Sequence, residues 1–165
     1  LLNFQEKNEL TGISAQIIGR DISPFSDYIV INRGKKDGID IGTVLISHKG
    51  LVGHVVSSGR NHSRALLISD RKARVCALVQ ETREAGILEG STTHLLKLRH
   101  LKMTSHVALG NTVITSGFGD IYTKGIPIGT VELIANEKSS AALYALVKPY
   151  VDFAQLEEVL CLKSD

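Results

Sequence analysis

Aromatic residues are scarce in this chain of 165 residues, which has no tryptophan and only 5% aromatic residues in total. Sites that stack bases or sugars need aromatic rings, so the sequence offers few such platforms. An excess of one charge is also lacking, because 19 lysines and arginines stand against 17 aspartates and glutamates. Nucleic-acid-binding domains concentrate positive charge, so this near balance argues against that class. No apolar run approaches the ~18 residues of a membrane-spanning helix.

Cysteine is rare as well, and the two cysteines, Cys76 and Cys161, stand far apart in the sequence. Neither belongs to the CxxC spacing typical of metal and redox sites. Both lie within apolar, strand-like runs, which favours two small buried thiols, while a disulfide between them stays open. The six histidines show no HxH or HxxxH spacing. We therefore predict no metal site and no cofactor.

Short apolar runs rich in valine, isoleucine and leucine fill most of the chain. Glycine, aspartate, asparagine or serine separates most of these runs. This spacing is typical of an all-β sandwich or barrel and leaves no room for crossover helices. Two regions favour helix instead. Residues 1–10 precede Gly12 and resemble the end of a longer coiled-coil helix, and residues 152–158 form a candidate single turn capped by Asp152.

Two segments of the sequence are weakly similar to each other. In the first, GTVLIS (42–47) leads to KGLVGHV (49–55), and in the second, GNTVITS (110–116) leads to KGIPIGTV (124–131). Both place a glycine before an apolar strand, a Lys-Gly turn after it, and another glycine in the next strand. We therefore expect two similar β units. The loop of the second unit is longer by GFGDIYT (117–123).

The longer loop contains Gly117-Phe118-Gly119, which could begin a nucleotide-binding motif. Tyr122 stands where that motif needs its third glycine, and a strand with a proline follows in place of a helix. We therefore predict no phosphate cradle, and expect glycines of the chain to serve turns and sharp bends instead. The turn glycines are Gly34, Gly38, Gly42, Gly50, Gly53, Gly90, Gly117, Gly125 and Gly129.

A chymotrypsin-like hydrolase is the second catalytic hypothesis, because that class combines two β-barrels with histidine, aspartate and serine in this chain order. His54 or His62, Asp70 and Ser116 supply the order. The Gly-Asp-Ser-Gly-Gly sequence that shapes the nucleophile turn is absent, and Ser116 stands before a glycine, a common pairing in turns. The triad therefore stands only as the alternative to a non-enzymatic function.

Five segments of the chain, with their glycine and proline positions, together resemble a known protein family. The segments, in order, are GRDISPFSDYIVINRGKKDGIDIG (19–42), GLVGHVVSSGRNHSRALLISD (50–70), GILEG (86–90), TSGFGDIYTKGIPIGTV (115–131) and VKPYVDFAQLEEVL (147–160). Taken together, they resemble the extracytoplasmic region of the MreC family of rod-shape-determining proteins. The match covers residues 13–162, nearly the whole chain.

The resemblance implies a fold of two small six-stranded β-barrels, at 12–81 and 82–165, with the final strand able to return to the first barrel. The end of a coiled-coil helix, at 1–11, would precede them. It also implies a non-enzymatic scaffold of the cell-elongation machinery, which lies in the periplasm and is anchored to the inner membrane through an upstream segment. The implied partners are a second copy or higher self-assembly, a class B penicillin-binding transpeptidase, MreD and the MreB system.

Three large apolar residues, Phe118, Ile121 and Tyr122, stand close together in the longer loop. If the loop exposes them, they form a contact patch for a partner. If it folds inward, they fill the seam of the barrel. We expect these three residues to bind a partner.

Overall fold

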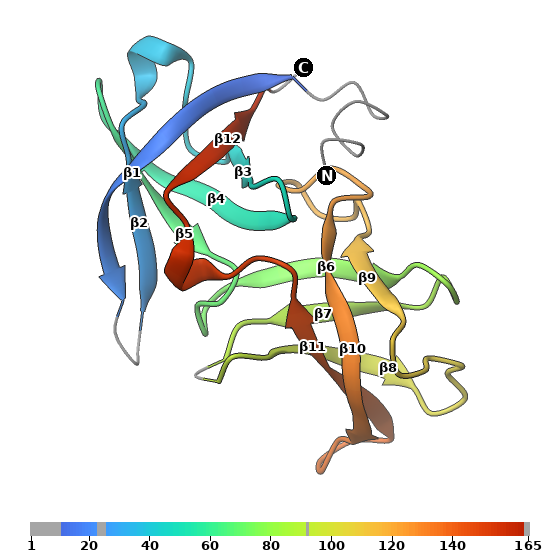
Figure 1. The fold of residues 1–165 in the computed structure, drawn as a ribbon. Coiled ribbons are helices and arrows are strands. Elements are labelled where there is room, and N and C mark those ends of the chain that lie inside the picture. The colour runs from blue at the N-terminus through green and yellow to red at the C-terminus, as the bar shows by residue number, and fades with distance from the viewer. Residues whose placement is uncertain (1–10, 23–25, 92, 164–165) are drawn as a thin grey trace. The chain divides into compact units, whose positions relative to one another are not determined.

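The computed structural model describes residues 11–22, 26–91 and 93–163, which form twelve β-strands and two single-turn 3-10 helices (Figure 1). The strands build two closed antiparallel barrels of six strands each. The all-β class and the two six-stranded barrels are therefore confirmed. The expected coiled-coil end at residues 1–11 falls almost wholly outside the described residues. Within the described ranges, no helix is long and apolar enough to cross a membrane.

The first barrel combines the N-terminal strands with the last strand of the chain, in the order β1-β12-β3-β4-β5-β2. Its β-branched residues alternate between inside and outside, so that Ile29 and Ile31 of β2 point inward without exposed surface. The elements are β1 (Gly12–Ile22), β2 (Asp27–Ile31), η1 (Lys35–Asp37), β3 (Val44–Ile46), β4 (Leu51–Ser58), β5 (Ser63–Leu67), η2 (Phe153–Gln155) and β12 (Glu158–Leu162).

The second barrel is continuous in sequence and has the order β10-β11-β8-β7-β6-β9. Val75, Ala77 and Val79 of β6 alternate inward in the same way. The strands are β6 (Arg74–Val79), β7 (Ala85–Glu89), β8 (Leu96–Lys102), β9 (Thr112–Thr115), β10 (Pro127–Asn136) and β11 (Ala142–Pro149).

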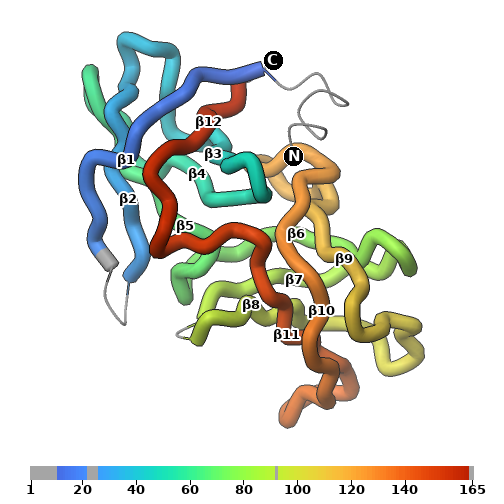
Figure 2. Tube along the Cα trace, in the orientation of Figure 1, coloured from blue at the N-terminus to red at the C-terminus, as the bar shows by residue number. Residues whose placement is uncertain are grey.

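The division between the barrels differs from the boundary that we expected between residues 81 and 82. The two units are residues 1–67 with 151–165, and residues 68–150. Figure 2 traces the chain through five strands of the first barrel, then all six of the second, before β12 returns to the first. The sequence hides this crossing because it falls inside the apolar run ALLIS (65–69), without a glycine, a proline or a polar linker.

The predicted turn near the C-terminus is present but shorter than residues 152–158. Asp152 precedes η2, and its carboxylate accepts a hydrogen bond from the Ala154 amide at 3.2 Å. The side chain thereby satisfies an amide at the start of the helix. The helix ends at Gln155 because Leu156 has an extended backbone, and Glu158 already pairs with Gln16 of β1.

The nine predicted turn glycines fall into two groups. Gly38, Gly42, Gly117 and Gly125 have φ between 83° and 94°, and Gly50 has a φ of 158° in the β3–β4 turn. The others lie where the chain has no room for a side chain. A Cβ atom would lie within 2.4 Å of a backbone oxygen at Gly34, Gly53, Gly90 and Gly129.

Candidate functional site

The loop between β9 and β10 divides its three large apolar residues between the surface and the interior. Phe118 is 72% exposed and Ile121 is 39% exposed, whereas Tyr122 is only 8% exposed. Burial raises the pKa of the Tyr122 phenol well above its ordinary value. The expected contact patch of three residues is therefore corrected to an exposed pair, with Tyr122 packed in the interior.

The base of this loop is closed by Thr115, which has no exposed surface. Its backbone amide donates to the Ile126 carbonyl at 3.0 Å, and the Gly125 amide donates to the Thr115 carbonyl at 3.0 Å. Its hydroxyl donates to the Thr123 carbonyl at 2.6 Å and accepts from the Ile126 amide at 2.8 Å. Backbone and side chain of one residue thus hold the returning end of the loop.

Ser116 holds the outgoing end of the loop to the neighbouring strand β6. Its amide and its hydroxyl both donate to the Cys76 carbonyl, at 2.9 and 3.0 Å. The same hydroxyl accepts from the Phe118 amide at 3.2 Å. Because a serine hydroxyl has one proton, and Ser116 gives it to a carbonyl, this side chain serves as a turn anchor.

The remaining members of the hypothetical triad also have local roles. The Asp70 carboxylate is buried and accepts from the Lys72 amide at 2.7 Å within a tight turn. His54 is a half-buried residue of β4, and burial lowers its pKa below the ordinary value. Both His54 and His62 belong to the first unit, and Asp70 and Ser116 belong to the second. The structure gives the Ser116 hydroxyl a backbone carbonyl as acceptor and the Asp70 carboxylate a backbone amide as donor.

Both cysteines are free thiols. Cys161 is buried in the first barrel, which raises the pKa of its thiol to about 11 and keeps it protonated. Cys76 is half-buried on β6. Among the described residues, no three histidine, cysteine, aspartate or glutamate side chains gather to form a possible metal site.

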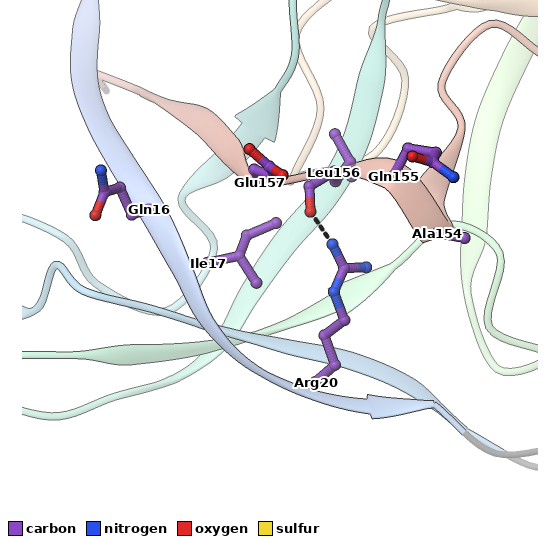
Figure 3. A pocket seen from close by; sticks show the side chains of 7 residues that line it. All are labelled: Gln16, Ile17, Arg20, Ala154, Gln155, Leu156 and Glu157. Carbon is purple, nitrogen blue, oxygen red and sulfur yellow. Dashed lines mark hydrogen bonds between the residues drawn. The ribbon is translucent and has the colours of Figure 1, made fainter.

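A polar pocket of about 500 Å³ lies in the first barrel, between β1 and the segment that leads from η2 into β12 (Figure 3). Arg20 reaches across it and donates to the carbonyls of Phe153, at 2.6 Å, and of Leu156. The guanidinium thus donates to one carbonyl within η2 and to one directly after it, a favourable place for a cation. Sequence reasoning missed this arginine because its partners lie more than 130 residues away.

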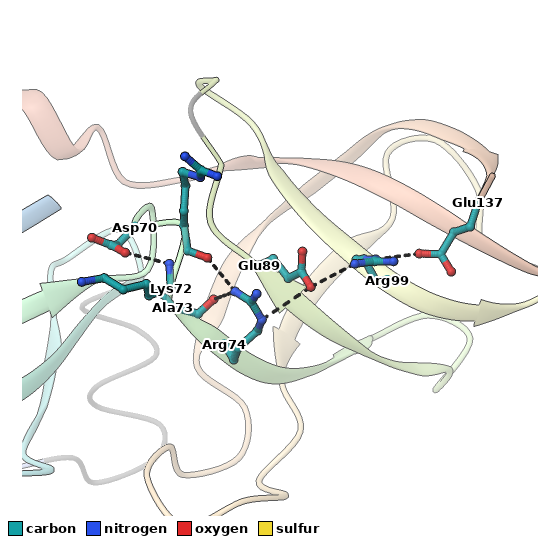
Figure 4. A network of polar contacts seen from close by, with 8 residues as sticks. Asp70, Lys72, Ala73, Arg74, Glu89, Arg99 and Glu137 are labelled. Atoms are coloured by element: carbon teal, nitrogen blue, oxygen red, sulfur yellow. Dashed lines mark hydrogen bonds and ion pairs between the residues drawn. The ribbon is translucent and has the colours of Figure 1, made fainter. Parts of the chain in front are cut away.

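Four charged side chains on the second barrel, alternately positive and negative, form a chain of ion pairs, shown in Figure 4. Glu89 lies 3.5 Å from Arg74 and 3.4 Å from Arg99, and Arg99 donates to Glu137 at 2.8 Å. The hydrogen bond from Arg99 holds the pKa of the Glu137 carboxyl below its ordinary value. The network joins neighbouring strands of the second barrel. Because its two positive and two negative charges cancel, it leaves little unbalanced charge for an ionic ligand.

A model of the rod shape-determining protein MreC, barrel core, matches residues 17–163. The chain belongs to the MreC family. The cell shape-determining protein MreC of Listeria monocytogenes is 34% identical over 156 residues, which cover 92% of this chain and 53% of that protein. MreC of Haemophilus influenzae is 29% identical, over 98% of this chain and 46% of that protein. The chain thus spans about half the length of these curated relatives.

Solved structures of the family have the same fold. MreC of Listeria monocytogenes has a TM-score of 0.85 at 30% identity, covering 98% of this chain and 83% of that chain. The crystal structure of MreC from Pseudomonas aeruginosa has a TM-score of 0.86 at 25% identity, covering 93% and 99%. A structure of penicillin-binding protein PBP2 in complex with MreC from Helicobacter pylori shares the fold at 14% identity, with a TM-score of 0.72 and coverage of 94% and 99%.

Proposed function

We propose that this chain is the extracytoplasmic core of a non-enzymatic scaffold in the bacterial cell-elongation machinery. Family membership supports the role in cell shape, since the relatives are cell shape-determining proteins. The Helicobacter pylori complex supports a penicillin-binding transpeptidase as the partner. The engagement of Ser116 with a backbone carbonyl supports a structural rather than a catalytic role for the loop.

The full-length protein, in this proposal, is anchored to the inner membrane by an upstream segment and reaches MreD and the MreB system through parts outside this chain. The upstream coiled coil promotes dimers and higher assemblies. Two related structures are described as the major periplasmic domain of a cell shape-determining filament, at 21% and 22% identity. That description supports the periplasmic location and the self-assembly.

Exposure of Phe118 is the observation that carries the contact proposal. A phenylalanine with 72% of its surface in water is unusual, and the loop that bears it is fixed at both ends by hydrogen bonds. Aromatic side chains dominate binding energy when a partner buries them. We infer that Phe118 and Ile121 insert into an apolar pocket of the transpeptidase.

A binding measurement with purified proteins tests the proposal. The chain would be titrated against the immobilised extracytoplasmic region of the penicillin-binding transpeptidase from the same organism. We expect specific binding, and we expect Phe118→Ala to weaken it about thirtyfold, which is typical of a central aromatic anchor.

Leu109→Ala is the matched control, because Leu109 is another large apolar side chain of the same barrel and is 66% exposed. It should change affinity less than about twofold. Absence of binding by the unsubstituted chain would contradict the scaffold proposal. Equal affinities of the chain and Phe118→Ala would place the contact on another surface.

A further inference from the structure

The first barrel has a residue equivalent to Thr115, which shows what is special about the threonine. Ser47, directly after β3, donates its amide to the Gly50 carbonyl at 2.9 Å, and Thr115, the last residue of β9, donates its amide to the Ile126 carbonyl at 3.0 Å. The Ser47 hydroxyl accepts from the amide of Lys49, two residues ahead, at 3.1 Å. The Thr115 hydroxyl instead joins positions eight and eleven residues ahead. The threonine thus spans a loop that the first barrel lacks.

The composition of the long loop makes such a closure necessary. Gly117, Gly119 and Gly125 have φ between 83° and 91°, and glycine has more conformational freedom than any other residue. A glycine-rich loop that bears an aromatic anchor would have to be ordered when the partner binds, and this ordering weakens affinity. Hydrogen bonds that order the loop beforehand reduce that loss.

We propose that Thr115 is a positioning residue for partner binding, and that Ser116 assists it. The two buried hydroxyls fix both ends of the loop, so that Phe118 and Ile121 are presented to the transpeptidase in one arrangement. Thr115 does not touch the partner, since it has no exposed surface. This inference rests on the proposed function, in which the loop is the contact.

The test replaces the Thr115 hydroxyl without changing the shape of the side chain. Thr115→Val keeps the branched side chain and its volume but removes the hydroxyl's bonds to the Thr123 carbonyl and the Ile126 amide. We expect it to weaken binding to the transpeptidase region about fivefold to tenfold through lost ordering of the loop. Thr115→Ser retains a hydroxyl and should restore affinity to within about twofold.

Ser47→Ala is the control from the first barrel, because it removes the equivalent hydroxyl where no long loop exists. It should leave affinity within about twofold of the unsubstituted chain. Amide hydrogen exchange supplies the second measurement. In Thr115→Val, exchange at residues 117–124 should accelerate at least tenfold, while the amides of β6 and β7 keep their protection.

The outcomes separate this inference from the proposed function. If Phe118→Ala does not weaken binding, the contact proposal and the positioning role both fail. If Phe118→Ala weakens binding while folded Thr115→Val matches the unsubstituted chain in affinity, only the positioning role fails. Should Thr115→Val not fold, Ser116→Ala decides, because it removes the hydroxyl's bonds to the Cys76 carbonyl and the Phe118 amide. Unchanged affinity of folded Ser116→Ala would likewise overturn the inference.

Discussion

The β3–β4 unit of the first barrel and the β9–β10 unit of the second match each other down to single hydrogen bonds. The Gly42 amide donates to the Val55 carbonyl at 2.8 Å, and the Gly110 amide donates to the Val131 carbonyl at the same distance. The two glycines also share a positive φ, of 94° and 86°. The weak similarity between these segments therefore reflects one structural unit that occurs twice.

The turn before each unit is built alike from different residues. The Thr43 hydroxyl accepts from the Asp40 amide at 3.1 Å, and the Asn111 side-chain oxygen accepts from the Ala108 amide at 2.8 Å. Threonine and asparagine both have a short side chain whose oxygen can reach a nearby backbone amide. Chemistry rather than residue identity is preserved in this turn.

Topology extends the correspondence to the whole barrels. In the first barrel β12 lies between β1 and β3, and in the second β6 lies between β7 and β9. Along the sequence, β12 is the last strand of the first barrel, whereas β6 is the first strand of the second barrel. The two barrels are thus circular permutations of one strand order, which is why the final strand must return to the first barrel.

The two units differ in what joins their strands. In the first barrel only two residues separate Ser47 from Gly50. In the second, eleven residues follow Thr115 before β10 begins. The structural register aligns Gly50 with Ile126, one residue beyond the Gly125 that the sequence similarity suggests. The shared frame gives stability to both barrels, and the insertion is where a function particular to the second barrel can lie.

The largest expected effect breaks the shared frame at its equivalent glycines. A Cβ at Gly53 would lie 2.0 Å from the Leu66 carbonyl oxygen, and one at Gly129 would lie 2.1 Å from that of Lys148. Because backbone must move to admit a methyl group, Gly53→Ala and Gly129→Ala should each lower the free energy of unfolding by about 3 kcal/mol. Urea unfolding followed by circular dichroism measures this.

Gly19→Ala is the control for the glycine substitutions. Its Cβ would lie 3.6 Å from Val30, an ordinary contact, so the change should be within about 0.5 kcal/mol. A loss at Gly129 with none at Gly53 would show that the two positions are not equivalent.

A smaller effect distinguishes the barrels by their ion pairs. The Glu137 side chain is 3% exposed and bonded to Arg99, whereas the Asp21–Arg64 pair of the first barrel is 63% and 47% exposed. The folded-state pKa of Glu137 lies below its unfolded-state value of roughly 4.3. Its charge therefore stabilises the barrel at neutral pH, and this contribution is lost as the pH falls below about 4.

Urea unfolding at pH 7 and pH 3 measures this difference. Glu137→Gln should unfold at lower urea than the unsubstituted chain at pH 7, and the two midpoints should approach each other at pH 3. Asp21→Asn should change stability at pH 7 by less than about 0.5 kcal/mol, since exposed pairs contribute little. A pH-independent deficit of Glu137→Gln would mean that packing, and not charge, is responsible.

The smallest expected effect concerns Ser116, the serine of the hypothetical hydrolase triad. Because its proton is directed to the Cys76 carbonyl, we expect no labelling by a fluorophosphonate probe above the level of a heat-denatured sample. Labelling that disappears in Ser116→Ala would contradict the non-enzymatic proposal.

The alternation of short apolar runs was sufficient to predict the barrels, because a strand buried on one face requires a period of two. The loop side chains were harder to place. Phe118, Ile121 and Tyr122 have the same apolar character in sequence, and only the course of the backbone puts Tyr122 inside. Thr115 could not be recognised either, since its two partners become neighbours only when the loop closes.

The affinity of two double variants for the transpeptidase region tests most directly whether function lies in the insertion rather than in the shared frame. Phe118→Ala with Ile121→Ala removes the exposed residues of the insertion. Ile41→Ala with Leu109→Ala removes the exposed residues of the shared turn, 68% and 66% exposed. We predict at least a hundredfold loss for the first and less than about threefold for the second. The reverse order, or equal losses, would contradict the account.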